Sequence, residues 1–523
     1  MILRIQSFKQ AAFWSTTIGA FSQLLALFFG MLMAAKFGAQ ESTDVLYYCL
    51  GVFALLSGLV QQVNVSVLVP ETMRRREQVG EADAMAFINR FFAVFLAISL
   101  TVAGLIFLNP AATLTKISKF PIATLEANHQ LVLWLVVAFP LQMVAQLLLD
   151  ILVSYRFLTL PVILSCVARV INILFVYLFG GRWGVISAAM GMTLGFALQI
   201  VVNVLVLARV VRWQWTAWRT RIGRVVIHNI LWSELGTLVS AAANYLPLLL
   251  FSGFSAGALT ALNYAKRMSR VPMDMLTSQF SAVTAVKFNE LTAQREYGEL
   301  NISFERISRV TIFILVPLAA LLALLGFDLV SFLFGHGRFR GEALHLAGLL
   351  FSIFVLNLPM TGFMTITARY LVARQAIRYG VLWQIFSNVF NAIIVVITIH
   401  FWGPVGYPIG LCIHLLAYML IITASMVRRF QGIPIVSVWR TFAAVVTTAT
   451  LAALPTIGMR DWLGGDASVW VMGMASAVIF CVAYGLLLWV WPPDRMAWKY
   501  CVNLVVSMYR KTFHRNAGLP GNK

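Results

Sequence analysis

Long apolar runs separated by short polar segments follow one another along almost the whole chain. Most runs reach about 20 residues, the length at which an α-helix crosses the hydrocarbon core of a bilayer. The pattern predicts an all-α, polytopic membrane protein. The fourteen expected spans are 11–35, 45–69, 86–108, 131–155, 158–178, 185–207, 228–251, 257–284, 307–325, 343–368, 379–399, 405–426, 438–456 and 469–491.

The composition supports this interpretation. Hydrophobic residues make up 60% and charged residues 11% of the 523 residues, whereas about a quarter of a soluble domain is charged. No polar stretch exceeds about 30 residues, which is too short for a typical domain. The five cysteines are scattered without metal-ligand spacing, so we interpret them as small core residues and expect neither a metal site nor a cofactor.

The net charge of +20 is unevenly distributed. With the N-terminus in the cytoplasm, 28 of the 39 Lys and Arg fall in cytoplasmic segments and 7 in outer ones. The positive-inside rule then predicts that both termini are cytoplasmic and that the number of spans is even. We expect no nucleic-acid partner, because no basic module with interleaved aromatic residues stands outside the spans. The remaining four cations lie within spans: Arg169, Lys266, Arg267 and Arg270.

An internal repeat appears when the chain is shifted by 219 residues. Asn172 then falls on Asn391, and the pair Trp183-Gly184 falls on Trp402-Gly403. The repeat predicts two six-span lobes related by an axis along the membrane normal, with a central cavity between them. The expected organisation is an N-lobe at 1–208, an amphipathic basic linker at 209–226, a C-lobe at 227–430, two further spans within 431–491 and a basic cytoplasmic tail at 492–523.

One face of the eighth span collects polar residues. Asn263, Arg267, Arg270 and Asp274 are spaced by four, three and four residues, so they share one helix face, and Lys266 borders it. Arg267 lies about 15 Å from the outer end of the span, close to the midplane of a core about 30 Å thick. A charge at this depth usually faces a water-filled cavity.

Arg169 lies about 16 Å into the fifth span and is also near the midplane. The intramembrane cations outnumber the nearby acids, and arginine matches phosphate through two parallel hydrogen bonds. The sequence therefore predicts an anionic, phosphate-bearing ligand. Structural roles remain open: ion pairs with Asp150, Glu234 or Asp274, and extension of Lys266 toward the membrane surface.

The repeat places Tyr47 and Tyr48 of the first lobe at the positions of Lys266 and Arg267 in the second. Aromatic faces stack on sugar rings or line apolar tails. We therefore expect a cavity that is basic on the second lobe and aromatic on the first. An amphiphile with an anionic head group fits such a cavity better than a cationic drug.

Four segments carry a family resemblance: KFGAQESTDVLYY at 36–48, SAGALTALNYAKRMSRVPMDML at 255–276, LFGHGRF at 333–339 and FNAIIVVITIHFWGPVGYPIG at 390–410. Over roughly residues 10–430 the chain resembles the MurJ/MviN branch of the multidrug/oligosaccharidyl-lipid/polysaccharide (MOP) exporter superfamily. The resemblance implies fourteen spans in two lobes. It also implies a flippase of the bacterial inner membrane that moves undecaprenyl-pyrophosphate-linked saccharides, notably lipid II, to the outer leaflet by alternating access.

The resemblance also assigns residues. Arg267 falls on the family's cavity arginine and Asp44 on its TD aspartate, whereas Lys266 replaces a family acid. Three family arginines of the first two spans are replaced by Gln23, Phe29 and Ser57. We interpret the chain as a paralogue that handles a related lipid-linked glycan, such as an exopolysaccharide repeat unit, rather than lipid II. The expected head-group contacts are Arg267, Arg270, Lys266, Arg169, Asn263, Asp44, Tyr47 and Tyr48.

The energy source is open, because the chain has no ATP-binding P-loop and either a membrane potential or an ion gradient could serve. Polar residues of the seventh and eleventh spans are candidates for an ion-coupling site, although hydrogen bonds between helices explain them equally well. They are Glu234, Asn244, Asn388 and Asn391.

Three other function classes compete with a flippase. A drug/cation antiporter of the same superfamily would favour carboxylates over arginines in the cavity. A membrane glycosyltransferase or ligase would need catalytic groups on sizeable outer loops, but the longest, 109–130, has no paired carboxylates or metal cluster. We therefore expect a protein that is not an enzyme. A scaffold without transport is the third alternative.

Overall fold

The computed structural model describes residues 8–155, 157, 159–215, 218, 220, 222–463 and 468–503. These residues form helices and no strand, which confirms the predicted all-α class. The elements of the first half are α1 (Phe8–Phe37), α2 (Glu41–Val63), η1 (Asn64–Leu68), α3 (Val69–Gln78), α4 (Glu81–Leu108), α5 (Pro110–Ile117), α6 (Ile122–Ala127), α7 (His129–Ser154), α8 (Thr159–Trp183), α9 (Ile186–Val206), η2 (Leu207–Val211) and α10 (Arg224–Phe251). Those of the second half are α11 (Ala258–Ala293), α12 (Tyr297–Leu324), α13 (Gly326–Phe334), α14 (Glu342–Val355), α15 (Leu358–Ala373), α16 (Ile377–Trp402), η3 (Gly403–Val405), α17 (Gly406–Arg429), α18 (Ile435–Leu463) and α19 (Val469–Val490).

Among the described residues, 11 helices are long and apolar enough to cross a membrane, or 12 if the bent pair α14 and α15 forms one span. The 36-residue helix α11 is not among them, because charged side chains interrupt its apolar character. The expected span at 45–69 is too short, since α2 continues through the π-helical η1 into α3 and the helix runs from Glu41 to Gln78. Multiple membrane crossings are confirmed, whereas the number fourteen stays a prediction.

The chain divides by its internal contacts into two compact units. Unit 1 comprises residues 1–264, 333–346 and 388–404, and unit 2 comprises residues 265–332, 347–387 and 405–523. Both α11 and α16 contribute residues to each unit. The lobe boundaries expected from the repeat stay a prediction.

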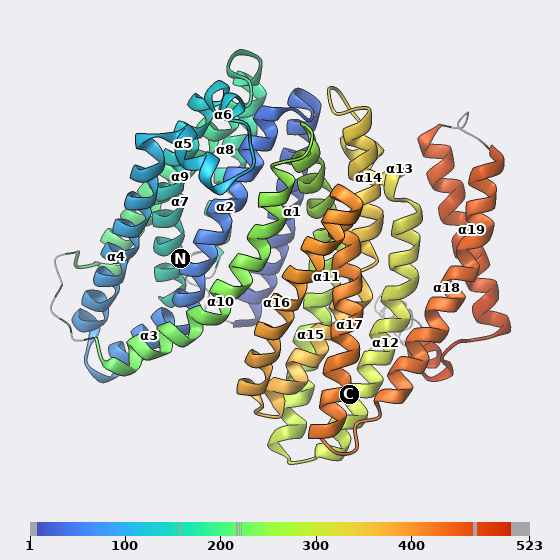
Figure 1. The fold of residues 1–523 in the computed structure, drawn as a ribbon. Coiled ribbons are helices and arrows are strands. Elements are labelled where there is room, and N and C mark those ends of the chain that lie inside the picture. Colours follow the sequence, from blue (N-terminus) through green and yellow to red (C-terminus); the bar gives the residue numbers. More distant parts are fainter. Residues whose placement is uncertain are drawn as a thin grey trace, which may run out of the picture. The chain divides into compact units, whose positions relative to one another are not determined.

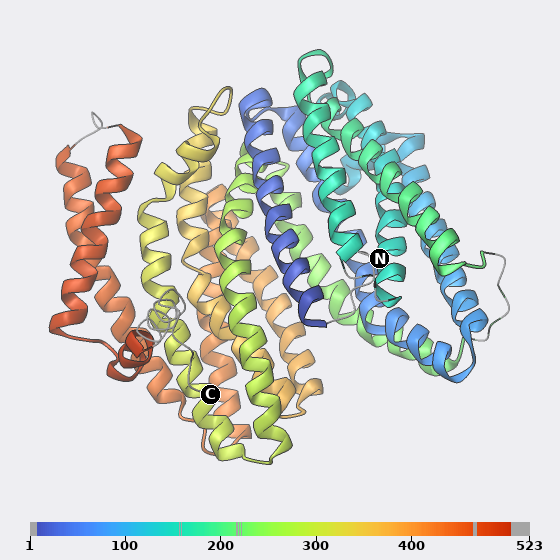
Figure 2. The same cartoon turned by 180° about the vertical axis from the view of Figure 1, so that it is seen from behind.

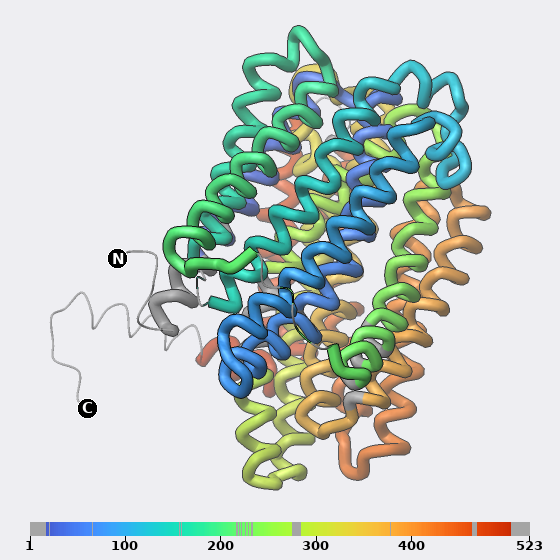
Figure 3. The backbone as a smooth tube through the Cα atoms, turned by 90° about the vertical axis from the view of Figure 1, so that its left-hand side faces the viewer, coloured from blue at the N-terminus to red at the C-terminus, as the bar shows by residue number. Residues whose placement is uncertain are grey.

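The helix α7 forms the centre of unit 1 and packs against α2, α4 and α9 (Figure 1). Its buried residues occur all round the helix rather than along one stripe, as expected for a helix surrounded by others. Further pairs are α1 with α8, α8 with α9, and α2 with α10. At one end of this unit a tight turn joins α3 to α4 (Figure 3), and Gly80 in this turn has a φ of 124° that other residues rarely adopt.

In unit 2, α12 packs against α15, α18 and α19. The core between these helices contains large buried aromatic rings, including Phe304, Phe363 and Tyr370. The α18–α19 hairpin, which corresponds to the last two expected spans, stands beside α12 (Figure 2). These two helices are therefore an integral part of the unit 2 core.

A buried carboxylate fixes the chain where it leaves α19. Asp494 accepts two hydrogen bonds from Arg309, from Nε at 2.7 Å and from Nη2 at 2.9 Å, and one from Thr441 Oγ1 at 2.6 Å. Its side chain is 1% exposed. Burial alone would raise the pKa of Asp494, but these hydrogen bonds and one from the Ala497 amide outweigh burial and hold the pKa below its usual 3.8.

The substitution Asp494→Asn is expected to lower stability by about 2 kcal/mol at neutral pH, because it removes a charge-assisted pair. A depressed pKa stabilises the fold above the unfolded value, and this contribution is lost as pH falls through the folded pKa. The difference in thermal unfolding temperature between wild type and variant should therefore shrink below pH 3.8. A difference that stays constant on acidification would contradict this assignment.

Candidate functional site

The intramembrane cations of the second half lie on α11. Asn263, Arg267, Arg270 and Asp274 belong to one continuous α-helix, and their spacing places them on one face. Arg267 is half-buried and Arg270 is exposed. Among the described residues no ion pair joins Arg270 to Asp274, so the structure gives no support to that neutralising pair.

Lys266 has an aromatic partner that the sequence did not reveal. Its Nζ lies 4.5 Å from the centroid of the Tyr407 ring at the start of α17. Tyr407 is buried and packs edge-to-face against Phe354. A cation over an aromatic face is stabilised without an acid. The Lys266 charge is therefore held by α17 within unit 2.

Arg169 lies on α8 of unit 1 and is exposed. Asp150, one of the acids considered as a counter-charge, instead accepts hydrogen bonds from two amides. Asn64 Nδ2 donates at 2.7 Å and Gln146 Nε2 at 3.2 Å. This acid is thus satisfied by neutral donors of η1 and α7.

The structure places Asp44 in a buried helix junction. Its carboxylate accepts hydrogen bonds from the Gly257 amide (2.7 Å), the Thr260 amide (2.8 Å) and Thr260 Oγ1 (2.5 Å). The Thr260 amide belongs to the first turn of α11 and the Gly257 amide directly precedes that helix. Unpaired N–H groups and the helix dipole favour a negative charge at this end of a helix. Asp44, only 4% exposed, therefore joins α2 to α11, and its expected head-group contact stays a prediction.

Tyr47 and Tyr48 are also enclosed by protein, with 2% and 0% exposure. Tyr47 contacts the ring of Tyr264 edge-to-face, with centroids 5.7 Å apart. The Tyr48 hydroxyl donates to the carbonyl of Ile117, as does that of Tyr245. Both rings pack within unit 1 in this structure, and the expected aromatic wall of the cavity stays a prediction.

Three of the segments that carry the family resemblance meet at this junction. Tyr264 stacks on Phe334 and contacts Phe339 edge-to-face, with centroids 4.7 and 5.0 Å away. The Arg338 amide donates to the carbonyl of Ala35 at 3.1 Å. The segments 36–48, 255–264 and 333–339 thus form one packed cluster. The glycines in these motifs were the available signal, since tight backbone contacts require glycine.

The variant Gly337→Ala is expected to destabilise the protein about 2 kcal/mol more than Gly341→Ala, because of overpacking. Both glycines have positive φ, 76° and 66°, so both variants share the strain of a left-handed residue. A Cβ at Gly337 would collide with the backbone of Ala35, whereas one at Gly341 meets nothing within 4 Å. Thermal unfolding in detergent measures the difference, and equal losses would refute the packing argument.

The candidate ion-coupling residues all belong to unit 1, Glu234 and Asn244 on α10 and Asn388 and Asn391 on α16. Asn244 Nδ2 donates to the Ser240 carbonyl at 2.8 Å. Three buried atoms lack a hydrogen-bond partner in the described structure: Glu234 Oε1, Asn388 Nδ2 and Asn391 Oδ1. The described residues contain no group of three or more His, Cys, Asp or Glu that could hold a metal ion.

At the positions of the replaced family arginines, Gln23 is exposed, Phe29 is buried and Ser57 is half-buried. Phe29 is 7% exposed, so an arginine there would need a buried partner. The replacement of that arginine by phenylalanine is consistent with a fully packed position in α1.

Comparison with known families decides the identity. A profile of the lipid II flippase MurJ family matches residues 33–477. The chain belongs to this family. Comparison with curated proteins gives no match. As a MurJ-family member, the chain is a multi-pass membrane transporter of the class that flips lipid-linked precursors.

Solved structures show the same fold. A structure of the lipid II flippase MurJ in an inward closed conformation is 16% identical, with a TM-score of 0.73 over 90% of this chain and 97% of that one. An inward-facing multidrug resistance MATE family transporter of the MOP superfamily is 14% identical, with a TM-score of 0.64 over 79% and 96%. A MATE transporter of Vibrio cholerae is 14% identical, with a TM-score of 0.53 over 80% and 96%. The family match confirms the expected MurJ/MviN resemblance, and the chain shares its fold with these solved structures.

Proposed function

We propose that this MurJ-family protein flips an undecaprenyl-pyrophosphate-linked saccharide from the inner to the outer leaflet of the bacterial cytoplasmic membrane by alternating access. Both termini then lie in the cytoplasm, in agreement with the distribution of Lys and Arg. The observation that carries the proposal is the family match over residues 33–477, which includes the cation-bearing face of α11.

Arg267 is the proposed principal contact for the pyrophosphate. It is half-buried on α11, and a guanidinium can hold two phosphate oxygens at once. Arg270, Arg169 and Asn263 remain proposed contacts. Lys266 contributes charge while its ammonium stays over the Tyr407 ring.

The cargo we propose is a lipid-linked glycan related to lipid II, such as an exopolysaccharide repeat unit. Support comes from the replacement of three family arginines by Gln23, Phe29 and Ser57, which changes the charge offered to a head group. Expression in a strain depleted of its lipid II flippase tests this point. Full rescue of growth would refute the paralogue hypothesis and leave lipid II as the cargo.

Mass spectrometry of lipids that co-purify with the detergent-solubilised protein tests the proposal as a whole. A pyrophosphate-linked glycolipid is the expected result, and the masses of its sugars would identify the glycan. A folded protein that carries none, but exports cationic drugs from intact cells, would favour a drug antiporter. Synthesis of a polymer by the purified protein would instead favour an enzyme.

Coupling to an ion is proposed for the polar residues of α10 and α16. Support comes from the partnerless buried atoms of Glu234, Asn388 and Asn391, because buried polar atoms are normally satisfied. Asn244 is retained with them as a more exposed member. The dependence of flipping on a proton or sodium gradient in proteoliposomes distinguishes this arrangement from hydrogen bonding between helices.

A further inference from the structure

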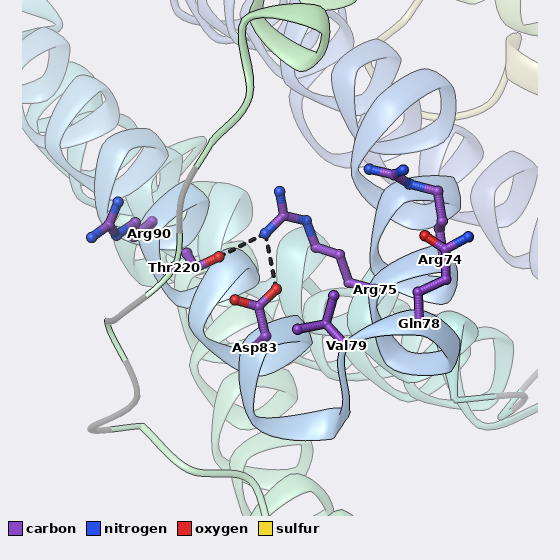
Figure 4. A pocket seen from close by; sticks show the side chains of 7 residues that line it. All are labelled: Arg74, Arg75, Gln78, Val79, Asp83, Arg90 and Thr220. Atoms are coloured by element: carbon purple, nitrogen blue, oxygen red, sulfur yellow. Dashed lines mark hydrogen bonds and ion pairs between the residues drawn. The ribbon is translucent and has the colours of Figure 1, made fainter.

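A basic pocket of about 710 Å³ lies at one end of unit 1 (Figure 4). It is formed by the end of α3, the first turns of α4 and Thr220, which precedes α10 in the sequence. Its lining includes three arginines, Arg74, Arg75 and Arg90, but a single carboxylate, Asp83. The pocket is large enough for a polar head group, since small-ligand pockets typically measure about 300–1,000 Å³.

The side chain of Arg75 is held in place by several contacts in this pocket. Its Nε donates to Glu71 at 2.8 Å, and its Nη1 donates to Asp83 at 3.0 Å and to Thr220 at 2.6 Å. Its guanidinium carbon also lies 4.4 Å from the centroid of the Phe87 ring. The charge of Arg75 is balanced by two acids, and its hydrogen bonds connect α3 with α4 and Thr220. We therefore assign Arg75 a structural role rather than a ligand contact.

Arg74 and Arg90 present the remaining positive charge. Arg74 shares Glu71 with Arg75 but its side chain is 57% exposed. The Nε of Arg90 donates to the Trp218 carbonyl at 2.8 Å, and within the described residues its two Nη nitrogens have no partner. The backbone contact orients a guanidinium whose outer edge can still bind an anion.

The position of the pocket along the chain indicates that the pocket lies at the depth of the lipid head groups. The apolar part of α4 begins after Asp83, and Arg90 lies seven residues further on the same face. An arginine at this depth extends its side chain toward the helix start and the membrane surface. Trp218 is 48% exposed beside it, as is typical of the membrane–water interface.

We propose that this pocket binds the phosphate group of a lipid head group at the cytoplasmic membrane surface. Basic pockets between helices at this level bind anionic lipids, and guanidinium groups match phosphate oxygens geometrically. Two sources share this chemistry, an anionic bilayer phospholipid and the diphosphate of a lipid-linked precursor. The inference depends on the described side chains and not on which glycan is transported.

Native mass spectrometry of the full-length protein in detergent tests the proposal, with phosphatidylglycerol as the probe. Phosphatidylcholine is the comparison, because it is a zwitterion of zero net charge. Binding of phosphatidylglycerol should weaken about five-fold for each of Arg74→Gln and Arg90→Gln, because one basic residue near a membrane contributes about that factor. Arg306→Gln is the matched control, since Arg306 is exposed on α12 and does not line the pocket. Arg75 is not substituted, because its hydrogen bonds maintain the structure of the pocket.

Unchanged binding in both pocket variants, or an equal loss in the control, would overturn the proposal. Inorganic pyrophosphate distinguishes the two sources. Displacement of phosphatidylglycerol by pyrophosphate from wild type, with weaker displacement in Arg90→Gln, assigns the pocket to a diphosphate head. Resistance to displacement assigns it to a bilayer phospholipid. If a variant does not fold, the salt dependence of binding to wild type decides, because a phosphate contact must weaken as salt rises.

Discussion

The substitution Arg267→Ala is expected to reduce flipping of the lipid-linked glycan by about 10- to 100-fold, the factor that corresponds to losing a hydrogen bond to a charged group. The flipping rate of Arg267→Lys should lie between those of wild type and Arg267→Ala, because lysine keeps the charge but cannot hold two phosphate oxygens in one plane. The measurement is the rate of glycolipid movement across proteoliposomes that contain the co-purified lipid.

Lys266→Gln serves as the internal comparison for this prediction. Its ammonium already lies over the Tyr407 ring, so less of its charge is available and a smaller loss than in Arg267→Ala is expected. Arg306→Gln on α12 should transport like wild type. Equal rates for Arg267→Ala and wild type, with the protein intact, would remove Arg267 from the proposed pyrophosphate contact.

The substitution Asp44→Ala is expected to destabilise the protein by about 3–5 kcal/mol, because it leaves buried donors without a partner. The Gly257 amide, the Thr260 amide and the Thr260 hydroxyl all donate to this carboxylate. The loss of stability in Asp44→Asn should be smaller, since an amide oxygen can still accept a hydrogen bond from the start of α11. Unfolding temperature in detergent measures both effects.

Glu41→Ala is the matched control for the loss of an acid from the first turn of α2. Glu41 is exposed and accepts one hydrogen bond, from Thr124 at 3.1 Å, so its removal should cost less than about 1 kcal/mol. A stable Asp44→Ala variant that no longer binds glycolipid would contradict the structural role and support Asp44 as a head-group contact.

The sequence by itself determined the class of the protein. Runs of about 20 apolar residues leave helices as the only way to satisfy the backbone in lipid, and the helical spacing of Asn263, Arg267 and Arg270 follows from the period of 3.6 residues. The motifs at 36–48, 255–276 and 333–339 were sufficient for the family. All of these signals are local in sequence, so they can be interpreted without knowledge of the tertiary contacts.

Only the tertiary structure decided which polar residues are already satisfied. Asp44 accepts hydrogen bonds from backbone amides at the start of α11, and Asp150 accepts them from two side-chain amides. Lys266 lies over the ring of Tyr407, more than 140 residues away in sequence. The repeat suggested that Tyr47 lines a cavity, but the structure buries it against Tyr264. Sequence spacing gives the face of a helix on which a side chain lies. It does not give the segment that covers that face, because the covering segment comes from a distant part of the chain.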